Sequence, residues 1–211
     1  MTDDAYGGIA ERYDTWFAFI DAPLRRRAFE LHPVGEGTTV LDVGCGTGTQ
    51  LAMYADAGAT CFGLDMSPSM LAVAERRLGD RAELTHGSGA DMPYEDASFD
   101  LVVGSLFLHE LEADLAGSIL REMARVVHPT GTVLIIDYRS GSLRWKGTAW
   151  RAFSMVTERL AGSDHYGAWR SYLADGGLAS WLPDELTVTQ EKIVAGGNLS
   201  IWLLARASDG D

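Results

Sequence analysis

Three closely spaced glycines are the first residues of this chain whose type and spacing point to chemistry. They are Gly44, Gly46 and Gly48, in the stretch VLDVGCGTG at residues 40–48, which also holds Asp42. Glycines permit a tight turn, and they let a ligand approach the backbone because no Cβ obstructs it. A helix that begins after such a loop presents unpaired N–H groups and a positive dipole end. We therefore expect a ligand at this loop, with Asp42 either contacting it or bracing the turn.

The spacing of these glycines narrows the choice of ligand. The dinucleotide fingerprint G-x-G-x-x-G would need its third glycine at position 49, where this chain has Thr49. The sequence has no G-x-x-x-x-G-K-[ST] run either, so a nucleoside triphosphate is not indicated. An NAD-dependent α/β oxidoreductase stays open as an alternative function, and calorimetric titration with NADH would test it.

The elements that must position this loop alternate between strands and helices. Predicted strands occupy residues 39–43, 60–65, 82–86, 99–104, 132–137, 186–190 and 199–205. Predicted helices occupy residues 9–31, 51–57, 67–78 and 115–127, the last one stopped by a turn at residues 128–131. This alternation implies an α/β fold with helices on both faces of a parallel sheet. Ligands of such sheets bind at the carboxyl ends of the strands, where the glycine loop would lie.

An aromatic-rich segment at about residues 140–179 interrupts the alternation. Its large apolar residues are Trp145, Trp150, Phe153, Met155, Tyr166, Trp169 and Tyr172. We interpret it as a helical elaboration of a single domain that spans residues 1–211, since no repeat, low-complexity tract or linker divides the chain. It would form a wall and cover of the ligand pocket; a structural helix pair, or a dimer interface, is the alternative.

Composition excludes several classes of function. The net charge is −13, with 17 Lys and Arg against 30 Asp and Glu, whereas a nucleic-acid-binding protein needs clustered cations. The sequence holds no apolar run of about 18 residues, as a membrane helix would need, and its start lacks the features of a signal peptide. Cys45 and Cys61 form neither a disulfide framework nor a metal-ligand pattern. We therefore expect a cytoplasmic protein without a metal, either monomer or homodimer, that binds no nucleic acid.

Residues 41–48, LDVGCGTG, resemble motif I of class I S-adenosylmethionine-dependent methyltransferases. Further segments match the family in order: an acidic residue ending the second strand, GADMPY at 89–94, SFDLVV at 98–103, and the helix and turn at 120–131, where Thr130 replaces the usual glycine. The resemblance covers roughly residues 5–139 and is closest to the ubiquinone- and menaquinone-biosynthesis type of small-molecule methyltransferase. It implies a Rossmann-like seven-stranded sheet with a reversed final strand.

The same resemblance implies a set of cofactor-binding residues for S-adenosylmethionine, with S-adenosylhomocysteine as the product. In similar proteins Asp65 would bind the ribose hydroxyls, Asp91 the adenine amino group, and Met92 would pack on the adenine ring. The full implied set is Tyr13, Asp42, Gly44, Gly46, Gly48, Asp65, Met66, Asp91, Met92 and Ser105. The cofactor has no phosphates, and accordingly the loop carries no lysine or arginine to clamp them.

His109, shortly after the fourth strand, is the best-placed candidate for a general base, since imidazole titrates near neutrality. A structural role, or packing against the substrate, is the alternative. Asp137 and Tyr138, which end the fifth strand, would face the same cleft. Trp150 and Trp169 are candidate pocket walls for the substrate.

The residues after the fourth strand bear on the methyl acceptor. They read GSLF at residues 104–107, and not the [ND]-P-P-[FY] motif of enzymes that methylate a planar nitrogen. Together with the aromatic-rich segment, this favours a small apolar or amphipathic acceptor such as a quinone, a lipid or a polyketide. Glu110 is expected to be a solvated side chain. A protein that binds S-adenosylmethionine without transferring its methyl group stays open as an alternative.

Overall fold

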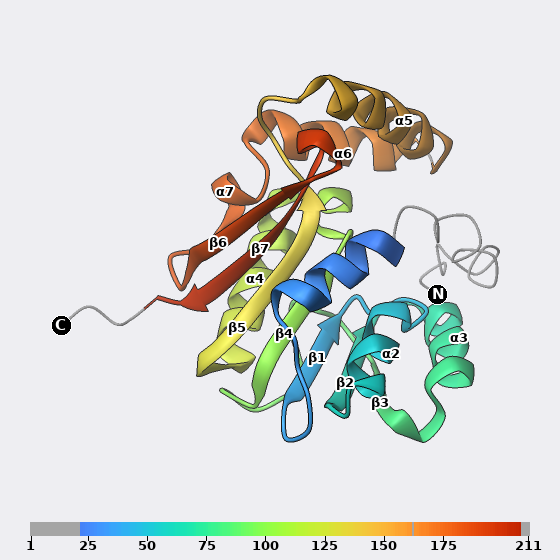
Figure 1. The fold of residues 1–211 in the computed structure, drawn as a ribbon, viewed down its shortest axis with the longest axis vertical. Helices are drawn as coiled ribbons and strands as arrows, with labels where there is room; N and C mark the ends of the chain where they lie inside the picture. Colours follow the sequence, from blue (N-terminus) through green and yellow to red (C-terminus); the bar gives the residue numbers. More distant parts are fainter. Residues whose placement is uncertain (1–21, 162, 208–211) are drawn as a thin grey trace.

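The computed structural model describes residues 22–161 and 163–207 and contains one seven-stranded sheet (Figure 1). The strands lie in the order β3-β2-β1-β4-β5-β7-β6. Their bounds are Thr39–Val43 (β1), Thr60–Asp65 (β2), Ala82–His86 (β3), Phe99–Ser105 (β4), Val127–Tyr138 (β5), Leu186–Val194 (β6) and Leu199–Arg206 (β7). The first five strands pair in parallel, and β7 is antiparallel to both of its neighbours. The predicted α/β fold with a reversed final strand is therefore confirmed.

The switch point of the sheet lies at β1. This strand pairs with β2 on one side and β4 on the other, so that Val43 stands opposite both Leu64 and Gly104. The chain leaves these three strands at one edge of the sheet. A space opens there because the connections after β1 and β4 lead away in opposite directions.

Helices cover both faces of the sheet. Their bounds are 22–31, Thr49–Asp56 (α2), Pro68–Leu78 (α3), Ala113–Val126 (α4), Trp145–Ala161 (α5), Ser163–Asp175 (α6) and Leu178–Trp181 (α7). Figure 1 shows the helix of residues 22–31 in front of the sheet and α4 behind it. The central strands are consequently apolar along their length, as in Val133–Ile136, whose side chains are fully buried.

The aromatic-rich segment forms α5 and α6, which Figure 1 shows above the carboxyl ends of β4 and β5. A short 3₁₀ helix after β4, Leu108–Glu110 (η2), packs against α6. We call α5 and α6 together the cap. Since the cap lies at the carboxyl ends of the strands, it is at the same edge of the sheet as the switch point.

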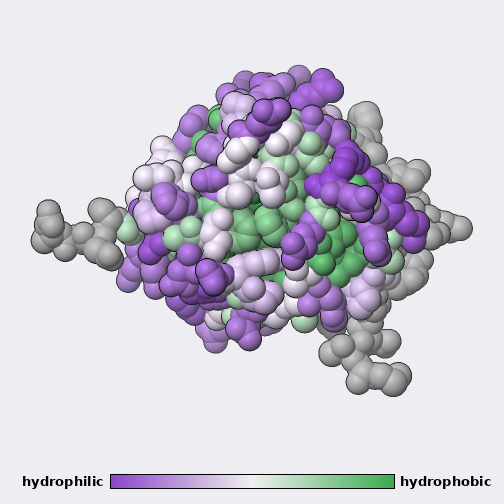
Figure 2. Space-filling view, turned by 90° about the horizontal axis from the view of Figure 1, so that it is seen from below, coloured by the Kyte–Doolittle hydropathy of each residue, from purple (hydrophilic) through white to green (hydrophobic). Residues whose placement is uncertain are grey.

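Figure 2 looks at the end of the molecule opposite to the cap, where hydrophobic residues gather in the middle of the face inside a hydrophilic rim.

The start of the fifth strand differs from the prediction. Residues 128–131 were expected to form a turn between a helix and a strand that begins at Thr132, but β5 already begins at Val127. Pairing with β4 shifts here, because Val127 stands opposite Phe99 while Thr132 stands opposite Leu101. Between these two pairs β5 has four residues and β4 has one, so β5 carries three extra residues at this irregularity, which hydrophobic periodicity does not reveal.

No helix within residues 22–161 and 163–207 is both long and apolar enough to cross a membrane. In the same residues no group of three or more His, Cys, Asp and Glu side chains is arranged to hold a metal ion.

Candidate cofactor and acceptor site

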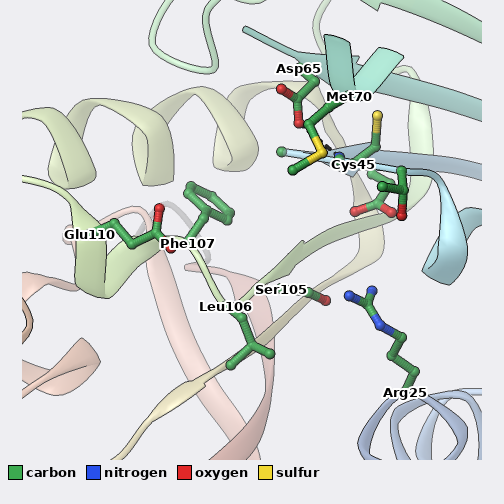
Figure 3. A pocket seen from close by; sticks show the side chains of 12 residues that line it. Arg25, Cys45, Asp65, Met70, Ser105, Leu106, Phe107 and Glu110 are labelled. Atoms are coloured by element: carbon green, nitrogen blue, oxygen red, sulfur yellow. Dashed lines mark hydrogen bonds between the residues drawn. The ribbon is translucent and has the colours of Figure 1, made fainter. Parts of the chain in front are cut away.

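A cavity opens at the carboxyl ends of β1, β2 and β4, beside the glycine loop (Figure 3). Its lining residues are Arg25, Asp42, Gly44, Cys45, Gly46, Thr47, Asp65, Met70, Ser105, Leu106, Phe107 and Glu110. Figure 3 shows Phe107 and Glu110 on one side, Asp65 and Met70 on the other, and Ser105 below them. The cavity therefore joins the glycine loop to the segment that follows β4.

Backbone hydrogen bonds fold the glycine loop onto the end of β2. The N–H groups of Gly44 and Cys45 donate to the carbonyl oxygen of Leu64 at 2.8 and 3.1 Å. The N–H of Gly46 donates to Asp65 Oδ2 at 2.7 Å. Gly44, Gly46 and Gly48 all have positive φ values, of 67°, 53° and 74°, a conformation that disfavours side chains. The loop thus needs glycine for its backbone path.

The three glycines differ in what surrounds them. A Cβ at Gly48 would lie 2.7 Å from a methyl group of Leu78, and one at Gly44 would lie 3.3 Å from the Phe107 ring. A Cβ at Gly46 would have no protein atom within 4 Å. Gly46 therefore faces the open space where a ligand can approach the backbone. Gly48 does not line the cavity and instead lets α2 pack against α3.

Asp65 joins the loop to the start of α3. Its Oδ1 accepts the N–H of Ser67 at 2.8 Å, while its Oδ2 accepts the N–H of Gly46. Ser67 in turn caps α3, because its Oγ accepts the N–H of Met70 at 3.2 Å and Pro68 occupies the first turn. The Asp65 carboxylate is consequently held at the cavity wall by two backbone donors.

Two buried polar atoms in the cavity wall, Oδ1 of Asp42 and Oγ of Ser105, make no hydrogen bond within the part of the chain that the structure describes. Burial raises the pKa of Asp42 to about 7, against the opposing effect of Arg25, and Asp65 raises it further. Buried polar atoms almost always have partners. These atoms and the open backbone at Gly46 fit a polar, positively charged ligand such as S-adenosylmethionine, with an orphaned carboxylate oxygen available to an ammonium or sulfonium group.

Three residues that the resemblance implies as cofactor contacts, Met66, Asp91 and Met92, do not line this cavity. Met66 is 65% exposed, Asp91 is exposed and Met92 is buried. Met92 is fixed through its backbone: its N–H donates to Glu122 Oε2 at 2.8 Å, and its carbonyl accepts from Arg125 at 3.1 Å. These three residues therefore stay predictions as cofactor contacts. Tyr13 lies outside the described residues.

His109 belongs to a buried cluster of charged groups. Its Nδ1 lies 2.7 Å from Oδ1 of Asp137, and its Nε2 lies 3.7 Å from Glu158 and 3.9 Å from Glu110. Tyr138 donates its hydroxyl to Glu158 at 3.0 Å and packs edge-on against the His109 ring. Burial by itself would lower the pKa of His109, but the charge and hydrogen bond of Asp137, with two further carboxylates, raise it to about 9. The imidazole is thus a cation near neutral pH.

This geometry argues against His109 as a general base. A protonated imidazole has no lone pair to accept a proton, and the side chain is buried and absent from the cavity wall. Asp137 and Tyr138 were expected to face the cleft, yet both are buried. Asp137 instead accepts the backbone N–H groups of Leu108 and His109, which fixes η2. Acceptor contact by Asp137 and Tyr138 stays a prediction.

The two tryptophans predicted as pocket walls lie in the cap, outside the cavity lining. Trp169 on α6 is 4% exposed, stacks on Tyr166 and meets Tyr138 edge-on. Trp150 on α5 is partly buried and contacts Phe153. Trp169 therefore packs the cap onto β5.

Several cavity residues were not identified from the sequence. Leu106 has a φ of 58°, which is strained for a residue with a side chain, and its N–H donates to Ile136. Glu110, expected to be solvated, lines the cavity and lies 3.3 Å from the Nε2 of His165 on α6. Arg25 reaches the cavity from the helix of residues 22–31. These residues are brought together by the tertiary fold, which residue spacing along the sequence does not predict. For Leu106 and Glu110, the position shortly after β4 was the one sequence feature that indicated the cavity.

Fold and cavity together are those of a class I methyltransferase, and comparisons with known proteins agree. Residues 41–135 match the family of methyltransferase domains. The chain is 37% identical over 118 residues to the demethylmenaquinone methyltransferase of Bacillus licheniformis, a match that covers 54% of this chain and half of that relative. It is 33% identical to the demethylmenaquinone methyltransferase of a Parafrankia species, over 92% of this chain and 85% of the relative.

Solved structures show the same fold. In the Haloferax volcanii complex between a methyltransferase and its activator Trm112, one chain superposes with a TM-score of 0.73 at 18% identity, covering all of both chains. This chain belongs to the S-adenosylmethionine-dependent methyltransferase family. S-adenosylmethionine is therefore its cofactor, and the alternative of an NAD-dependent oxidoreductase is not supported.

Proposed function

We propose that this protein transfers the methyl group of S-adenosylmethionine to a small apolar or amphipathic acceptor of quinone type. The observation that carries the proposal is the two-ended cavity. Glycine backbone and the carboxylates of Asp42 and Asp65 line one end, and Leu106, Phe107 and Glu110 line the other. The two relatives described above are demethylmenaquinone methyltransferases, which supports a quinone over a lipid or a polyketide.

The residues of the first end would hold the cofactor. Asp42 and Ser105 offer the orphaned oxygen atoms, and Gly46 offers open backbone. When bound, S-adenosylmethionine supplies an electrophilic methyl group on a positively charged sulfur. Transfer by in-line displacement depends chiefly on positioning, so few catalytic side chains are needed.

The residues of the second end would receive the acceptor. Leu106 and Phe107 give this part of the cavity apolar walls, which exclude water and suit a quinone ring. Methylation of a ring carbon or a hydroxyl releases a proton. Glu110 places a carboxylate at this end, within the cavity wall, where it can accept that proton. We therefore assign the base role to Glu110 in place of His109.

A transfer assay with labelled S-adenosylmethionine tests the proposal. We expect methylation of a short-chain demethylmenaquinone analogue, but not of a polyketide or a simple lipid. Glu110→Gln should lower kcat while leaving S-adenosylmethionine affinity nearly unchanged, and Glu112→Gln, an exposed neighbour on the chain, serves as the matched control. Tight S-adenosylmethionine binding without transfer to any acceptor would instead indicate a binding protein that does not transfer the methyl group.

A further inference from the structure

The outward face of α5 is apolar. Trp145, Ala149, Ala152 and Val156 follow one another at the spacing i, i+4, i+7 and i+11, which places them on one side of a helix. Trp145 is 79% exposed and Val156 is 53% exposed, and Phe153 beside them is 48% exposed. We call the set of exposed apolar residues on this face the α5 stripe. It consists of Trp145, Ala149, Ala152, Phe153, Met155 and Val156.

The opposite side of α5 fixes how the helix lies. A Cβ at Gly147 would clash with the carbonyl group of Gly196, so the backbones of the two segments are in direct contact there. Ser154 accepts a hydrogen bond from Asn198 at 3.0 Å, and Glu158 accepts one from Tyr138. Because Gly147, Ser154 and Glu158 are packed on the protein, the α5 stripe is left exposed to solvent. Figure 1 shows α5 at the far side of the cap from the sheet.

Basic residues stand at both ends of the α5 stripe. Arg144 and Lys146 lie at its beginning and Arg159 at its end, and all three are exposed. The only acidic residue within α5 is Glu158, which is buried. This contrasts with the net charge of −13 for the chain. The ammonium group of Lys146 lies 5.3 Å from the Trp145 ring centroid, so cation and aromatic ring share one surface.

We propose that the α5 stripe docks onto the surface of an anionic lipid bilayer, with α5 lying in the plane of the interface. Apolar residues along one helical face, flanked by Lys and Arg, are the features of helices that bind at such interfaces. Anionic headgroups attract each basic residue, and tryptophan favours the headgroup level.

A second copy of this chain fits the same face less well. Pairing two α5 stripes about a twofold axis would place the cations at the helix ends against one another, in parallel or antiparallel orientation alike. No exposed carboxylate on α5 could neutralise them. Like charges facing each other oppose association.

Docking would set the cap against the lipid, and the cap lies above the carboxyl ends of the strands that form the cavity. This arrangement suits an acceptor that partitions into membranes. The benefit to catalysis rests on the proposed function, whereas the docking itself does not. A binding measurement without acceptor therefore tests the docking independently of methyl transfer.

The experiment is co-sedimentation of the full chain with vesicles of phosphatidylcholine, with and without phosphatidylglycerol. We expect binding to the anionic vesicles that weakens with added salt. Loss of each basic residue near an anionic surface costs roughly a fivefold factor, and charge reversal adds repulsion, so the triple variant Arg144→Glu, Lys146→Glu, Arg159→Glu should reduce partitioning by on the order of 100-fold or more. Lys192→Glu, an exposed cation on β6, is the matched control.

The apolar part of the stripe is tested by the double variant Trp145→Ser, Val156→Ser, which should also lose binding. Ile193→Ser, which removes an apolar side chain that is 49% exposed on β6, is its control. Circular dichroism and calorimetric S-adenosylmethionine binding verify that each variant is folded. Absence of wild-type binding to anionic vesicles would overturn the proposal. So would a wild-type dimer, seen by analytical ultracentrifugation, that the stripe variants dissociate without any change in vesicle binding.

Discussion

The buried ion pair between His109 and Asp137 makes the stability of this protein depend on pH in a defined window. His109 has a pKa of about 9 in the folded protein, against an ordinary value of 6.5. Because the pKa of His109 is higher in the folded than in the unfolded protein, its protonation stabilises the fold. This contribution to the free energy of unfolding is fully present below pH 6.5 and is lost as the pH rises to about 9. Stability should therefore fall between about pH 6.5 and about pH 9, as one buried imidazole is deprotonated.

The size of this effect follows from the same two pKa values. Their difference corresponds to about 3 kcal/mol, at roughly 1.4 kcal/mol for each pH unit. Since His109 is fully buried, solvent does not screen the interaction strongly. For a chain of this length, a loss of about 3 kcal/mol across this pH window corresponds to a decrease in Tm of about 6–12 °C.

Urea unfolding of wild type and of His109→Gln across this window measures the effect. The free energy of unfolding of the wild type should decline steeply with pH, and that of the variant should change little. His128→Gln removes an exposed histidine and should keep the wild-type slope. If wild type and His109→Gln show the same slope, the imidazole is neutral in the folded protein, and its role as a general base becomes open again.

Four further predictions concern the cofactor end and the surface charge. Asp65→Ala should weaken S-adenosylmethionine binding by about 1.5–3 kcal/mol in calorimetry, the scale of hydrogen bonds to a charged group; unchanged affinity in a folded variant would remove Asp65 from the site. Gly46→Ala and Gly48→Ala both place a side chain on a residue with positive φ, which strains the backbone. In Gly48→Ala the new Cβ also clashes with Leu78, so this variant should have the lower Tm of the two. Gly46→Ala should chiefly impair cofactor binding, because its Cβ would enter open space. Because Asp42 has a pKa of about 7, affinity for the cationic cofactor should rise about tenfold from about pH 6 to about pH 8, and a flat profile would exclude contact with its carboxylate. Anisotropy titration at about 150 mM salt should show no sequence-selective binding of duplex DNA or tRNA.

Local signals in the sequence were sufficient for the framework of the site. Apolar runs gave the bounds of β1 and β2 as observed, and Ser67 followed by Pro68 marked the start of α3. The glycine spacing located the loop, since positive φ values and close backbone approach leave a direct trace in residue type. These features depend on neighbours within a few positions along the chain.

Features that depend on distant segments were not predictable in this way. Whether His109 is a base or a buried cation is decided by Asp137 on β5 and Glu158 on α5, which lie far from it in sequence. Glu110 was taken for a solvated side chain because nothing near it in the sequence indicates the cavity or His165 of α6. Charge states of buried groups are properties of the assembled fold.

The same buried cluster links the cap to the cavity. Asp137 holds the backbone of η2, the segment that ends in Glu110, and Glu158 ties α5 to the end of β5 through Tyr138. His165 then sets α6 against Glu110 itself. Asp137 and Glu158 thus fix the positions of η2 and α5, and Glu110 at the cavity wall contacts α6, which packs against α5. Because a buried cation cannot accept a proton while a carboxylate at the cavity wall can, the proposed mechanism gives His109 a structural role and Glu110 the role of base.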